Sequence, residues 1–423
     1  MPDTPLVTAE IVSVGTELLL GQIIDTHAPA MARLLASCGI ACQRRSTLGD
    51  NLERLTAGLK EALDRVDIVI TIGGLGPTAD DLTRDAIAAA LGDGLVKEPK
   101  VEEELRKFFA LRGVPFIESN AKQAMRPESA LLIANPNGTA PGLLCRKHGQ
   151  TIIALPGPAG EFNPMANGPV KAFLSRASGG GVIHSRTLRV TGIGESSVEE
   201  RIRHLMLGDN PTVAPYVHDD VHLRITARAP SVPEADALID PIEAAIRKIL
   251  GAAVYGTDET TLETAVIQEL SQRGQTVALA ESMTGGGIGA RLTSVPGSST
   301  VFLGGLIVYT PKAKTELLHI PADFLARHGP VSAEVAEAMA QAVRRHLGAD
   351  FGCAITGNAG LASDVDGKPI GQTYVAVAGP SGVRIEEAKY RGIREDIRRR
   401  AGQLALRTLR EALLDQGGTG FSR

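Results

Sequence analysis

Short apolar runs alternate with amphipathic stretches along most of the chain. Residues 9–15 (AEIVSVG) and 67–74 (DIVITIGG) are rich in the β-branched side chains that favour strands. Between them, residues 51–66 (NLERLTAGLKEALDRV) carry apolar positions at helical spacing, and we expect Asp50 to cap this helix. Strands that alternate with helices are typical of a parallel α/β sheet, and the alternation continues to residues 151–162 (TIIALPGPAGEF).

The pattern changes after a glycine-rich break at residues 178–182 (SGGGV). The following stretch predicts strand, helix, strand and helix, which is a small α+β module. The α/β alternation then restarts with a helix at about 260–273 and ends in an arginine-rich helix near 393–415. The sequence therefore predicts an α/β protein of three domains, with boundaries at residues 1–172, 173–257 and 258–423.

Length agrees with a division into three domains, and composition argues against two classes of function, nucleic-acid binding and membrane binding. A chain of 423 residues is too long for one ordinary core, and its net charge of −4 comes from interleaved acids and bases. This argues against a dedicated nucleic-acid surface and against a polybasic membrane segment. No apolar stretch reaches the roughly 18 residues of a membrane span. We expect a cytoplasmic protein that binds neither nucleic acid nor membrane.

The cysteines and the first residues support the same location. The four cysteines are scattered without the spacing of a zinc site, so we expect buried thiols in a reducing cytosol. The first ten residues (MPDTPLVTAE) lack the basic and apolar regions of a signal peptide. The cysteines are Cys38, Cys42, Cys145 and Cys353.

Two polar stretches in the first domain follow predicted strands. Residues 14–27 read VGTELLLGQIIDTH, and residues 71–85 read TIGGLGPTADDLTRD. The second stretch passes three glycines and enters a predicted helix whose first turn carries Asp80 and Asp81. Glycines let backbone N–H groups approach a phosphate, and paired carboxylates bind a divalent cation. A metal-assisted phosphate site is one interpretation; a tight turn whose acids complement the helix dipole is the other.

In the third domain, residues 278–287 (ALAESMTGGG) place a Glu–Ser pair where a buried strand ends. Ligands of open α/β sheets bind at that edge. Amide hydrolysis without a metal needs a nucleophile, a base and donors for the oxyanion. Ser282 is our candidate nucleophile, with donors from the N–H groups of Thr284 to Gly286. Lys314 is the candidate base, because burial and a nearby cation lower a lysine pKa.

Simpler roles exist for each of these residues. Ser282 suits a helix cap, and Lys314 suits a solvated helix lysine. Thr356 ends a third apolar run, where it either lines the same crevice or forms a turn. Arg394 and Arg398 lie four residues apart, which suits either a bidentate phosphate clamp or a solvated basic face.

Five motifs of the first domain resemble the CinA family, whose first domain resembles the molybdopterin-binding fold of MoaB and MogA. They are GTELLLGQIIDTH, GGLGPTADDLTRD, NAKQAMRP, NPNGTAPG and LPGPAGEF. The resemblance implies an ADP-ribose pyrophosphatase that needs a divalent metal (Mg, Mn or Co). By residue match it implies metal ligands at Glu17, Asp25, Asp80 and Asp81, and substrate contacts at Gly73, Gly74 and Thr78.

Further motifs resemble PncC, the nicotinamide mononucleotide deamidase fused to CinA. They are AESMTGG, GGLIVYTPKAK, HGPVSAEVAEAMA, AITGNAG, KPIGQTYVAVAG and RGIREDIRRRA. The resemblance implies cofactor-free hydrolysis of nicotinamide mononucleotide to nicotinate mononucleotide and ammonia, and a homodimer. It implies catalytic residues Ser282, Lys314, Tyr309 and Thr356, and substrate contacts at Glu281, Thr284, Gly285, Gly286, Arg394 and Arg398. Asn358 and Leu361 depart from the family's loop, which we expect either to reshape substrate access or to weaken the deamidase.

Two hypotheses follow. The first is an enzyme of pyridine-nucleotide recycling with both hydrolytic activities. The second is a non-catalytic nucleotide-binding or regulatory protein, linked to competence or the response to DNA damage as the family's name implies.

Overall fold

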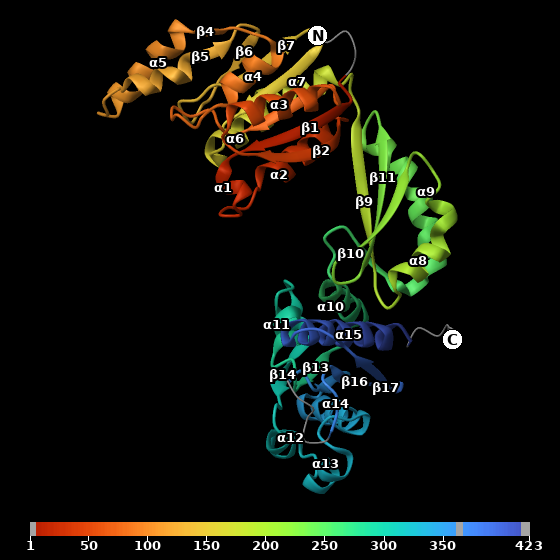
Figure 1. Cartoon of the computed structure of the whole chain (residues 1–423). Coiled ribbons are helices and arrows are strands. Elements are labelled where there is room, and N and C mark those ends of the chain that lie inside the picture. Colours follow the sequence, from red (N-terminus) through yellow and green to blue (C-terminus); the bar gives the residue numbers. More distant parts are fainter. Residues whose placement is uncertain (1–5, 361–366, 416–423) are drawn as a thin grey trace. The chain divides into compact units, whose positions relative to one another are not determined.

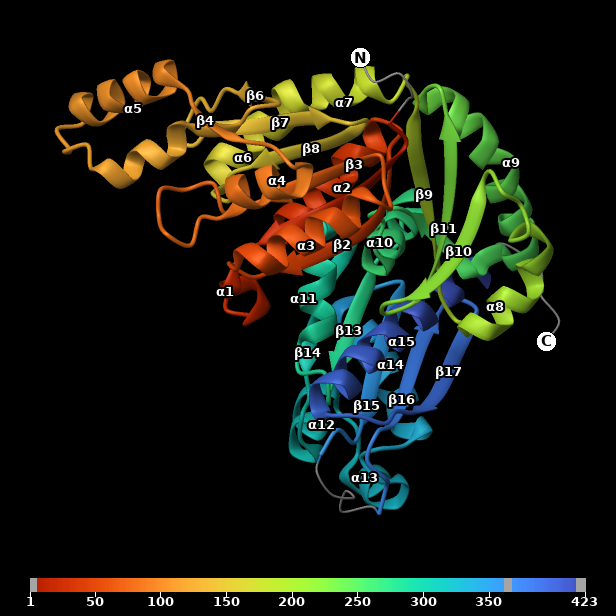
Figure 2. The ribbon, with the colours of Figure 1, turned by 45° about the horizontal axis from the view of Figure 1, so that its top comes forward.

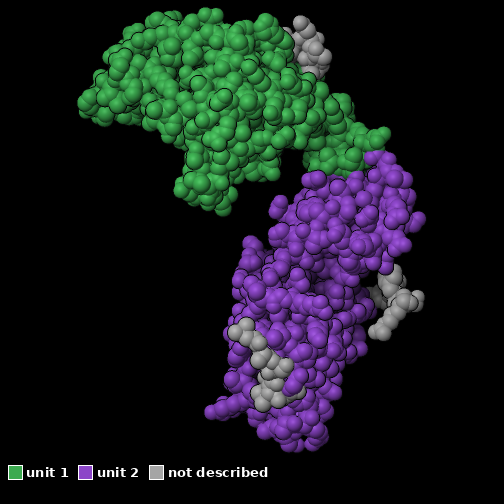
Figure 3. Space-filling model, in the orientation of Figure 1, with its two compact units in different colours: residues 1–185, 209–212, 226–241 green, residues 186–208, 213–225, 242–423 purple. Residues whose placement is uncertain are grey.

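The structure is a computed structural model that describes residues 6–360 and 367–415 (Figure 1). The chain divides into two compact units. Figure 3 shows the first unit, made of Met1–Ser185, Asp209–Thr212 and Thr226–Pro241, and the second, made of Arg186–Gly208, Val213–Ile225 and Ile242–Arg423. The division into three domains at the predicted boundaries stays a prediction.

A six-stranded sheet forms the centre of the N-terminal region. Its strands are β1 (Thr8–Val14), β2 (Ala41–Leu48), β3 (Ile68–Ile72), β6 (Ala130–Ile133), β7 (Gly142–Lys147) and β8 (Gln150–Leu155). They lie in the order β2-β1-β3-β8-β7-β6. The first four are parallel, as predicted, whereas β7 runs antiparallel to β6 and β8. The reversal is a short hairpin through His148 and Gly149, both at positive φ.

Helices cover both faces of this sheet. They are α2 (His27–Ser37), α3 (Leu52–Leu63), α4 (Thr83–Leu91), α6 (Ala159–Met165) and α7 (Lys171–Ala177). Neighbouring residues of β1 point to opposite faces, so Ile11 packs in one core with Met31 of α2, whereas Val12 packs in another with Leu55 of α3. Because β2, β1, β3 and β8 are parallel, their carboxyl ends lie at the same edge of the sheet.

The predicted cap of α3 was wrong by one residue. Asn51 is the N-cap, and its side chain accepts a hydrogen bond from the Arg54 N–H at 3.0 Å. Asp50 instead accepts a hydrogen bond from the N–H of Thr16 at 2.8 Å, at the start of α1 (Thr16–Leu19). Asp50 and Asn51 are adjacent, and both have short acceptor side chains suited to capping, so the sequence alone did not show which of them is the N-cap.

An excursion separates α4 from β6. It contains α5 (Pro99–Leu111) and a two-stranded sheet of β4 (Leu95–Lys97) and β5 (Met125–Pro127). Figure 2 shows α5 beside β4 at the margin of the N-terminal region. The described part of the chain also contains 3₁₀ helices at Glu118–Ala124, Arg203–Leu205, Gly251–Ala253 and Ser298–Thr300, and a π-helix at Ala166–Val170.

The middle module is an α+β fold, as predicted, with two more strands than the sequence indicated. Its elements are β9 (Val182–Val190), α8 (Glu195–Ile202), β10 (Thr212–Val217), β11 (Val221–Ala229), α9 (Val232–Leu250) and β12 (Val254–Thr257). The sheet order is β10-β11-β9-β12. β10 was missed because it contains Pro215, which lowers strand propensity and is tolerated at a sheet edge such as this one.

A five-stranded sheet forms the centre of the C-terminal region. Its strands are β13 (Val277–Glu281), β14 (Phe302–Ile307), β15 (Phe351–Gly357), β16 (Gln372–Gly379) and β17 (Gly382–Lys389), in the order β14-β13-β15-β16-β17. β13 is parallel to β14 and β15, and the two remaining pairs are antiparallel. The helices are α10 (Leu262–Arg273), α11 (Gly287–Thr293), α12 (Pro311–Leu318), α13 (Ala322–His328), α14 (Ala333–Leu347) and α15 (Arg394–Leu414).

The two faces of this sheet differ in side-chain size. Val277 and Leu279 of β13 belong to the core that α10 and α15 cover, whereas Ala278 and Ala280 belong to the core that α14 covers. β15 and β16 repeat the alternation. The alanine face lets α14 approach the sheet closely, and β13 ends between two parallel neighbours at Ser282.

The remaining sequence predictions concern cysteines and membranes. Cys38, Cys145 and Cys353 are buried and unpaired, as expected, and Cys42 is half-buried. Within the described part of the chain, none of the helices has the length and apolar character needed to cross a membrane.

Candidate active sites

A cavity of about 600 Å³ lies at the carboxyl ends of the parallel strands in the N-terminal region. The loops that follow β1, β3 and β8 supply most of its lining, which is where ligands bind in open α/β sheets. Its polar side chains and glycines include Ser13, Glu17, Asp25, His27, Gly73, Gly74, Gly76, Asp81, Gln123, Thr139 and Glu161. Five of the seven residues predicted for this site line it, and Thr78 and Asp80 do not.

The Asp25 carboxylate is fixed by its own chain. It accepts hydrogen bonds from the Ser13 hydroxyl at 2.5 Å and from the N–H groups of His27 and Ala28 at 3.0 and 2.9 Å. Burial raises the pKa of Asp25, but these hydrogen bonds outweigh burial and leave the pKa below its usual value. Asp25 is therefore a permanently charged carboxylate in the cavity near neutral pH.

Asp81 shapes the glycine-rich loop after β3. Its carboxylate accepts hydrogen bonds from the Gly76 N–H at 2.7 Å, from the Thr78 N–H at 2.8 Å and from the Thr78 hydroxyl. The prediction that Asp80 and Asp81 lie in the first turn of a helix was wrong, because α4 begins at Thr83. These bonds curl the chain back on itself before the helix starts. Asp80 is exposed beside this loop.

Arg84 binds the carbonyls of the same loop, and sequence reasoning missed this residue. The side chain is 1% exposed and donates hydrogen bonds to the carbonyls of Leu75 and Gly76. Its Nε has no hydrogen-bond partner among the described residues, and burial lowers the pKa of Arg84 to about 10. Arg84 lies at helical spacing from apolar positions of α4 that are buried. This spacing is the only sequence signal for its burial, and it was missed because charged side chains are expected at the surface.

The cavity offers oxygen ligands of the kind that hard divalent cations prefer. Glu17, Asp25, Asp81 and Glu161 supply carboxylates to its lining. No cluster of three or more His, Cys, Asp or Glu side chains with metal-binding geometry occurs among residues 6–360 and 367–415. Magnesium commonly uses one or two protein carboxylates together with substrate phosphates and water, and this lining fits that mode.

In the C-terminal region, Ser282 and Lys314 meet inside the protein. Lys314 Nζ donates hydrogen bonds to Ser282 Oγ and to the Val308 carbonyl, both at 3.1 Å. Lys314 is 1% exposed and Ser282 6% exposed. Ser282 follows β13, whereas Lys314 lies on α12. Thr310 caps α12 by accepting the Ala313 N–H at 3.1 Å. The cap fixes the start of α12 and directs Lys314 inward.

Glu281 folds the turn that follows Ser282. Its carboxylate accepts the N–H groups of Gly286, Ile288 and Gly289 at 3.0, 3.1 and 2.8 Å. The Gly285 N–H donates to the Ser282 carbonyl at 3.1 Å. Two of the three N–H groups expected to serve an oxyanion are therefore engaged by the chain itself, which leaves that of Thr284 as the candidate. Gly285 and Gly286 have positive φ, as so tight a turn requires.

Two arginines of α15 approach this turn and the loop beside it. Arg398 donates to the carbonyls of Met283 and Thr284 at 3.0 and 2.6 Å. Arg394 donates to the Tyr309 hydroxyl at 2.8 Å and to the Ala359 carbonyl at 3.0 Å. Arg398 thus fixes the turn that carries Ser282, while Arg394 joins the exposed Tyr309 to the neighbouring loop.

The remaining predicted residues surround the Ser–Lys pair in different ways. Thr356 is fully buried, and its hydroxyl donates to the Pro330 carbonyl at 2.8 Å. Thr284 is 3% exposed, and its hydroxyl has no hydrogen-bond partner among the described residues. Asn358 accepts the Gly360 N–H at 2.8 Å and donates to the Lys368 carbonyl at 3.1 Å, so it organises its loop. Leu361 lies outside the described residues.

Three family models match the chain in succession. Residues 10–176 match the model described as "Probable molybdopterin binding domain". Residues 185–256 match the "Damage-inducible protein CinA KH domain", and residues 259–413 match the "CinA C-terminal domain".

Relatives of similar length match across almost the whole chain. A "Putative competence-damage inducible protein" of Moorella thermoacetica is 43% identical over 413 residues, covering 96% of this chain and 99% of the relative. A "CinA-like protein" of Prochlorococcus marinus is 43% identical over 403 residues, covering 95% and 92%. A solved structure of the protein CinA from Thermoplasma acidophilum, described as of unknown function, is 31% identical, with a TM-score of 0.37, and covers 39% of this chain and 98% of that one.

Proposed function

This chain belongs to the CinA family, and from that premise we propose that its C-terminal region hydrolyses the carboxamide of nicotinamide mononucleotide. The products are nicotinate mononucleotide and ammonia. The observation that carries the proposal is the buried contact of 3.1 Å between Lys314 Nζ and Ser282 Oγ. A serine that shares a hydrogen bond with a base is the arrangement that nucleophilic catalysis requires.

The reaction needs two transfers of the same proton. In this proposal Lys314 acts as a neutral amine. It takes the Ser282 proton as Oγ attacks the carboxamide carbon, and it returns that proton to the departing nitrogen. Ammonia leaves, and an ester joins Ser282 to the nicotinoyl group. Water then attacks this ester with Lys314 again as base, which releases the carboxylate and restores the serine.

The surrounding residues support this chemistry without reacting. Glu281 and Arg398 fix the turn, so the Ser282 hydroxyl stays within reach of Lys314. The Thr284 N–H is the candidate donor to the oxyanion. In this proposal Arg394 turns from the Tyr309 hydroxyl to the phosphate of the substrate, where a guanidinium binds more strongly.

We propose a second activity for the N-terminal cavity, the cleavage of the diphosphate of ADP-ribose-like nucleotides. Its support is the joint presence of a glycine-rich loop and several carboxylates in one cavity of about 600 Å³. A bound divalent cation supplies charge neutralisation for the diphosphate. Glu17, Asp25 and Glu161 are the side chains that would bind it in this proposal. The Gly73 N–H already donates to the Leu155 carbonyl at 2.9 Å, so the Gly74 N–H is the loop donor that would serve the phosphates.

Ammonia release from the full chain tests the first proposal. We expect release on addition of nicotinamide mononucleotide, with or without a chelator, and no release from the Ser282→Ala variant. A folded wild-type protein that binds the mononucleotide but releases no ammonia would instead support the alternative of a regulatory nucleotide-binding protein. The homodimer, the cytoplasmic location and the absence of nucleic-acid binding stay predictions.

A further inference from the structure

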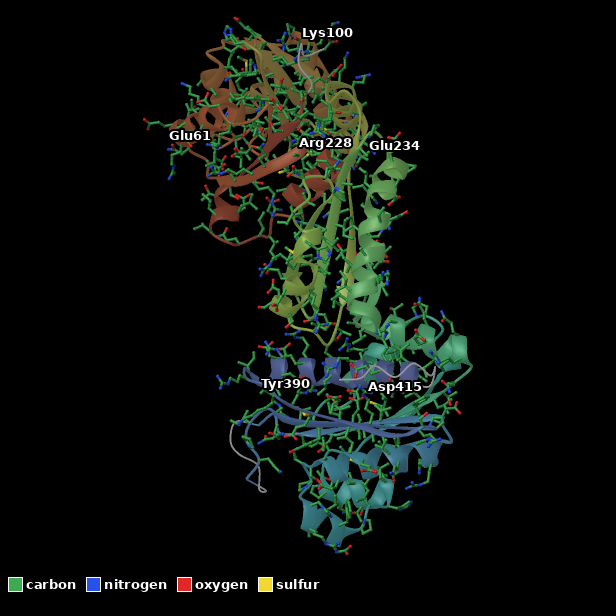
Figure 4. The ribbon with its side chains drawn as sticks, turned by 90° about the vertical axis from the view of Figure 1, so that its right-hand side faces the viewer. Glu61, Lys100, Arg228, Glu234, Tyr390 and Asp415 are labelled. Carbon is green, nitrogen blue, oxygen red and sulfur yellow. The ribbon has the colours of Figure 1, made fainter. Side chains whose placement is uncertain are left out.

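Gln403 of α15 bonds to two segments of the second compact unit that are distant in sequence. Figure 4 shows α15 between the labelled residues Tyr390 and Asp415, which flank its ends along the chain. The Gln403 side chain donates from Nε2 to the Asp220 carboxylate. Its Oε1 accepts a hydrogen bond from Arg291 Nη2 at 2.7 Å. One amide therefore connects a carboxylate on one side to a guanidinium on the other.

The two partners of Gln403 have opposite hydrogen-bonding needs. A guanidinium only donates and a carboxylate only accepts, whereas an amide does both from neighbouring atoms. The Asp220 carboxylate also accepts the Thr191 hydroxyl at 3.1 Å. Burial raises the pKa of Asp220, and the bonds from Gln403, Thr191 and Tyr255 act against that rise. Loss of the Gln403 amide would leave this carboxylate with fewer donors.

Asp220 lies in a different module from its partner on α15. It occupies the turn between β10 and β11, within residues 185–256, which match the KH model. Gln403 and Arg291 lie in the part of the chain that matches the CinA C-terminal domain. The bonds of Gln403 therefore connect the middle module to α11, the helix that follows the turn of Ser282.

Side chains hold α11 near both of its ends. At its start, two of its N–H groups donate to Glu281, the residue before Ser282. In its last turn, Arg291 binds Gln403 and also Glu263 of α10, the latter at 2.8 Å. Isolated helices of seven residues are unstable in water, so tertiary contacts fix the position of α11. A shift of α11 would move Glu281 and, with it, the Ser282 hydroxyl.

We infer that Gln403 is a positioning residue for Ser282, and that the middle module anchors Gln403 through Asp220. The inference rests on the amide hydrolysis proposed for the C-terminal region and adds a dependence of that site on the middle module. Gln403 acts through Arg291 and α11. A displacement of about 1 Å between reacting atoms lowers a rate roughly a hundredfold, so a small shift of α11 is enough to affect the reaction.

Labelling of Ser282 by a fluorophosphonate tests the inference on the full chain, because it reports the reactivity of the serine without the proposed substrate. Ser282 Oγ forms a bond to phosphorus, fluoride leaves, and the serine proton passes to Lys314. Mass spectrometry follows the rate. Gln403→Met keeps the side-chain length and removes both hydrogen bonds, so we expect it to slow labelling about tenfold or more. It should also lower kcat for nicotinamide mononucleotide more than it raises KM.

Exchange of the amide and the carboxylate provides a rescue. Gln403→Glu alone brings two carboxylates together and should slow labelling as Gln403→Met does. Asp220→Asn combined with Gln403→Glu keeps the net charge, and the amide at position 220 can donate to the carboxylate at position 403. Arg291 can still donate to that carboxylate, so we expect most of the wild-type rate to return.

Arg399→Met is the matched control. Arg399 lies on the same helix and pairs with Asp219 of the same turn, and its other ion pair is with Asp396 of α15. Neither partner belongs to α11, so this variant should label at the wild-type rate. Melting temperatures of all variants identify those that are folded at the assay temperature.

The outcomes separate this inference from the proposal on which it rests. If Gln403→Met folds and labels as the wild type does, or if Arg399→Met slows labelling equally, the positioning role is wrong and the Ser–Lys proposal stands. If Gln403→Met fails to fold, Gln403→Glu with and without Asp220→Asn decides, and absence of rescue overturns the inference. A wild type whose Ser282 is labelled but which releases no ammonia contradicts the proposed substrate alone. A wild type that does neither overturns both.

Discussion

The two candidate sites occupy equivalent places in their sheets but use their side chains in different ways. Both lie at the carboxyl ends of parallel strands. In the C-terminal site, Ser282 and Lys314 contact each other and are buried. In the N-terminal site, Asp25 and Asp81 contact mainly backbone N–H groups and hydroxyls of their own loops, around an open cavity.

The two sites differ in the origin of their reactive group. The C-terminal site contains a nucleophile and a base within the chain, so nothing from outside needs to be recruited before attack. The N-terminal site contains a shaped and charged surface without a comparable pair, so its chemistry depends on a cation and water that arrive with the substrate. Four changes to the protein or its medium test this distinction.

The largest effect is expected from the Ser–Lys pair. Ser282→Ala and Lys314→Met should each lower deamidation by roughly three orders of magnitude or more, and the double variant should lose little further, because the two residues act as one unit. Ammonia release measures the loss. Diphosphate cleavage should be unchanged in all three variants.

Lys312→Met is the matched control, since its side chain is 80% exposed on the same helix. It should keep the activity of the wild type. If Ser282→Ala folds and retains near wild-type turnover, the Ser282 hydroxyl does not carry the chemistry and water attacks directly. The cap role that the sequence suggested for Ser282 is wrong, because α11 begins at Gly287 with Gly286 as its N-cap.

The next effect concerns the metal. A chelator should abolish diphosphate cleavage and leave ammonia release unchanged, which separates the sites without any mutation. Asp81→Ala should lower diphosphate cleavage about a hundredfold and also lower the melting temperature, because three hydrogen bonds that shape the loop are lost.

Asp80→Ala is to be compared with Asp81→Ala. The Asp80 carboxylate is exposed and does not line the cavity, so its loss should not disturb the loop. If Asp80 binds the metal, as the resemblance implies, its loss should raise the metal concentration needed for activity without a change in melting temperature. Full cleavage in excess chelator would contradict a metal-dependent site, whichever acid is changed.

Acidification should affect the two activities unequally. Lys314 must be neutral to accept a proton in the proposed mechanism, so deamidation should fall as the solution is acidified. Hydrogen bonds outweigh burial and leave the pKa of Asp25 below its usual value, so this carboxylate keeps its charge well into the acidic range. Between pH 8 and pH 5 the charge of Asp25 is therefore constant. If both activities fell in parallel on acidification, the proposal that only deamidation depends on a neutral lysine would be wrong.

The smallest effect is expected at the edge of the C-terminal site. Arg394→Ala should raise KM for nicotinamide mononucleotide about tenfold but change KM for nicotinamide riboside little, because only the mononucleotide carries a phosphate. Tyr309→Phe is the control that removes the hydrogen bond to Arg394 and keeps the guanidinium. Equal changes with both substrates would refute a phosphate contact.

Side chains at strand ends were the part of these sites that the sequence predicted best. Ser282 follows an apolar run, and Lys314 follows a Thr–Pro helix start, so local patterns located both. Their contact joins residues 32 positions apart, and it depends on the tertiary packing of α12 on α14, which no local pattern reveals. The parallel centre of each sheet was likewise predictable, because alternating strands and helices force crossovers.

The structure differs from the sequence predictions where a side chain bonds to distant parts of the chain. Arg84 is buried because two carbonyls of the glycine-rich loop accept its hydrogen bonds, and no local pattern reveals such partners. The acids after that loop were assigned to a helix because carboxylates favour first turns, but Asp81 instead bonds to Gly76 and Thr78. Sequence reasoning thus located the polar residues but not the bonds that already engage them.

The alanine face of the C-terminal sheet constrains how this protein can evolve. α14 packs on Ala278, Ala280 and their neighbours, and α12 packs on α14, so Lys314 is placed at the end of a stack of close contacts. One added methylene under α14 shifts that stack, and a displacement of about 1 Å at reacting atoms lowers a rate roughly a hundredfold. A mutational scan should therefore show a band of activity-sensitive alanines remote from Ser282.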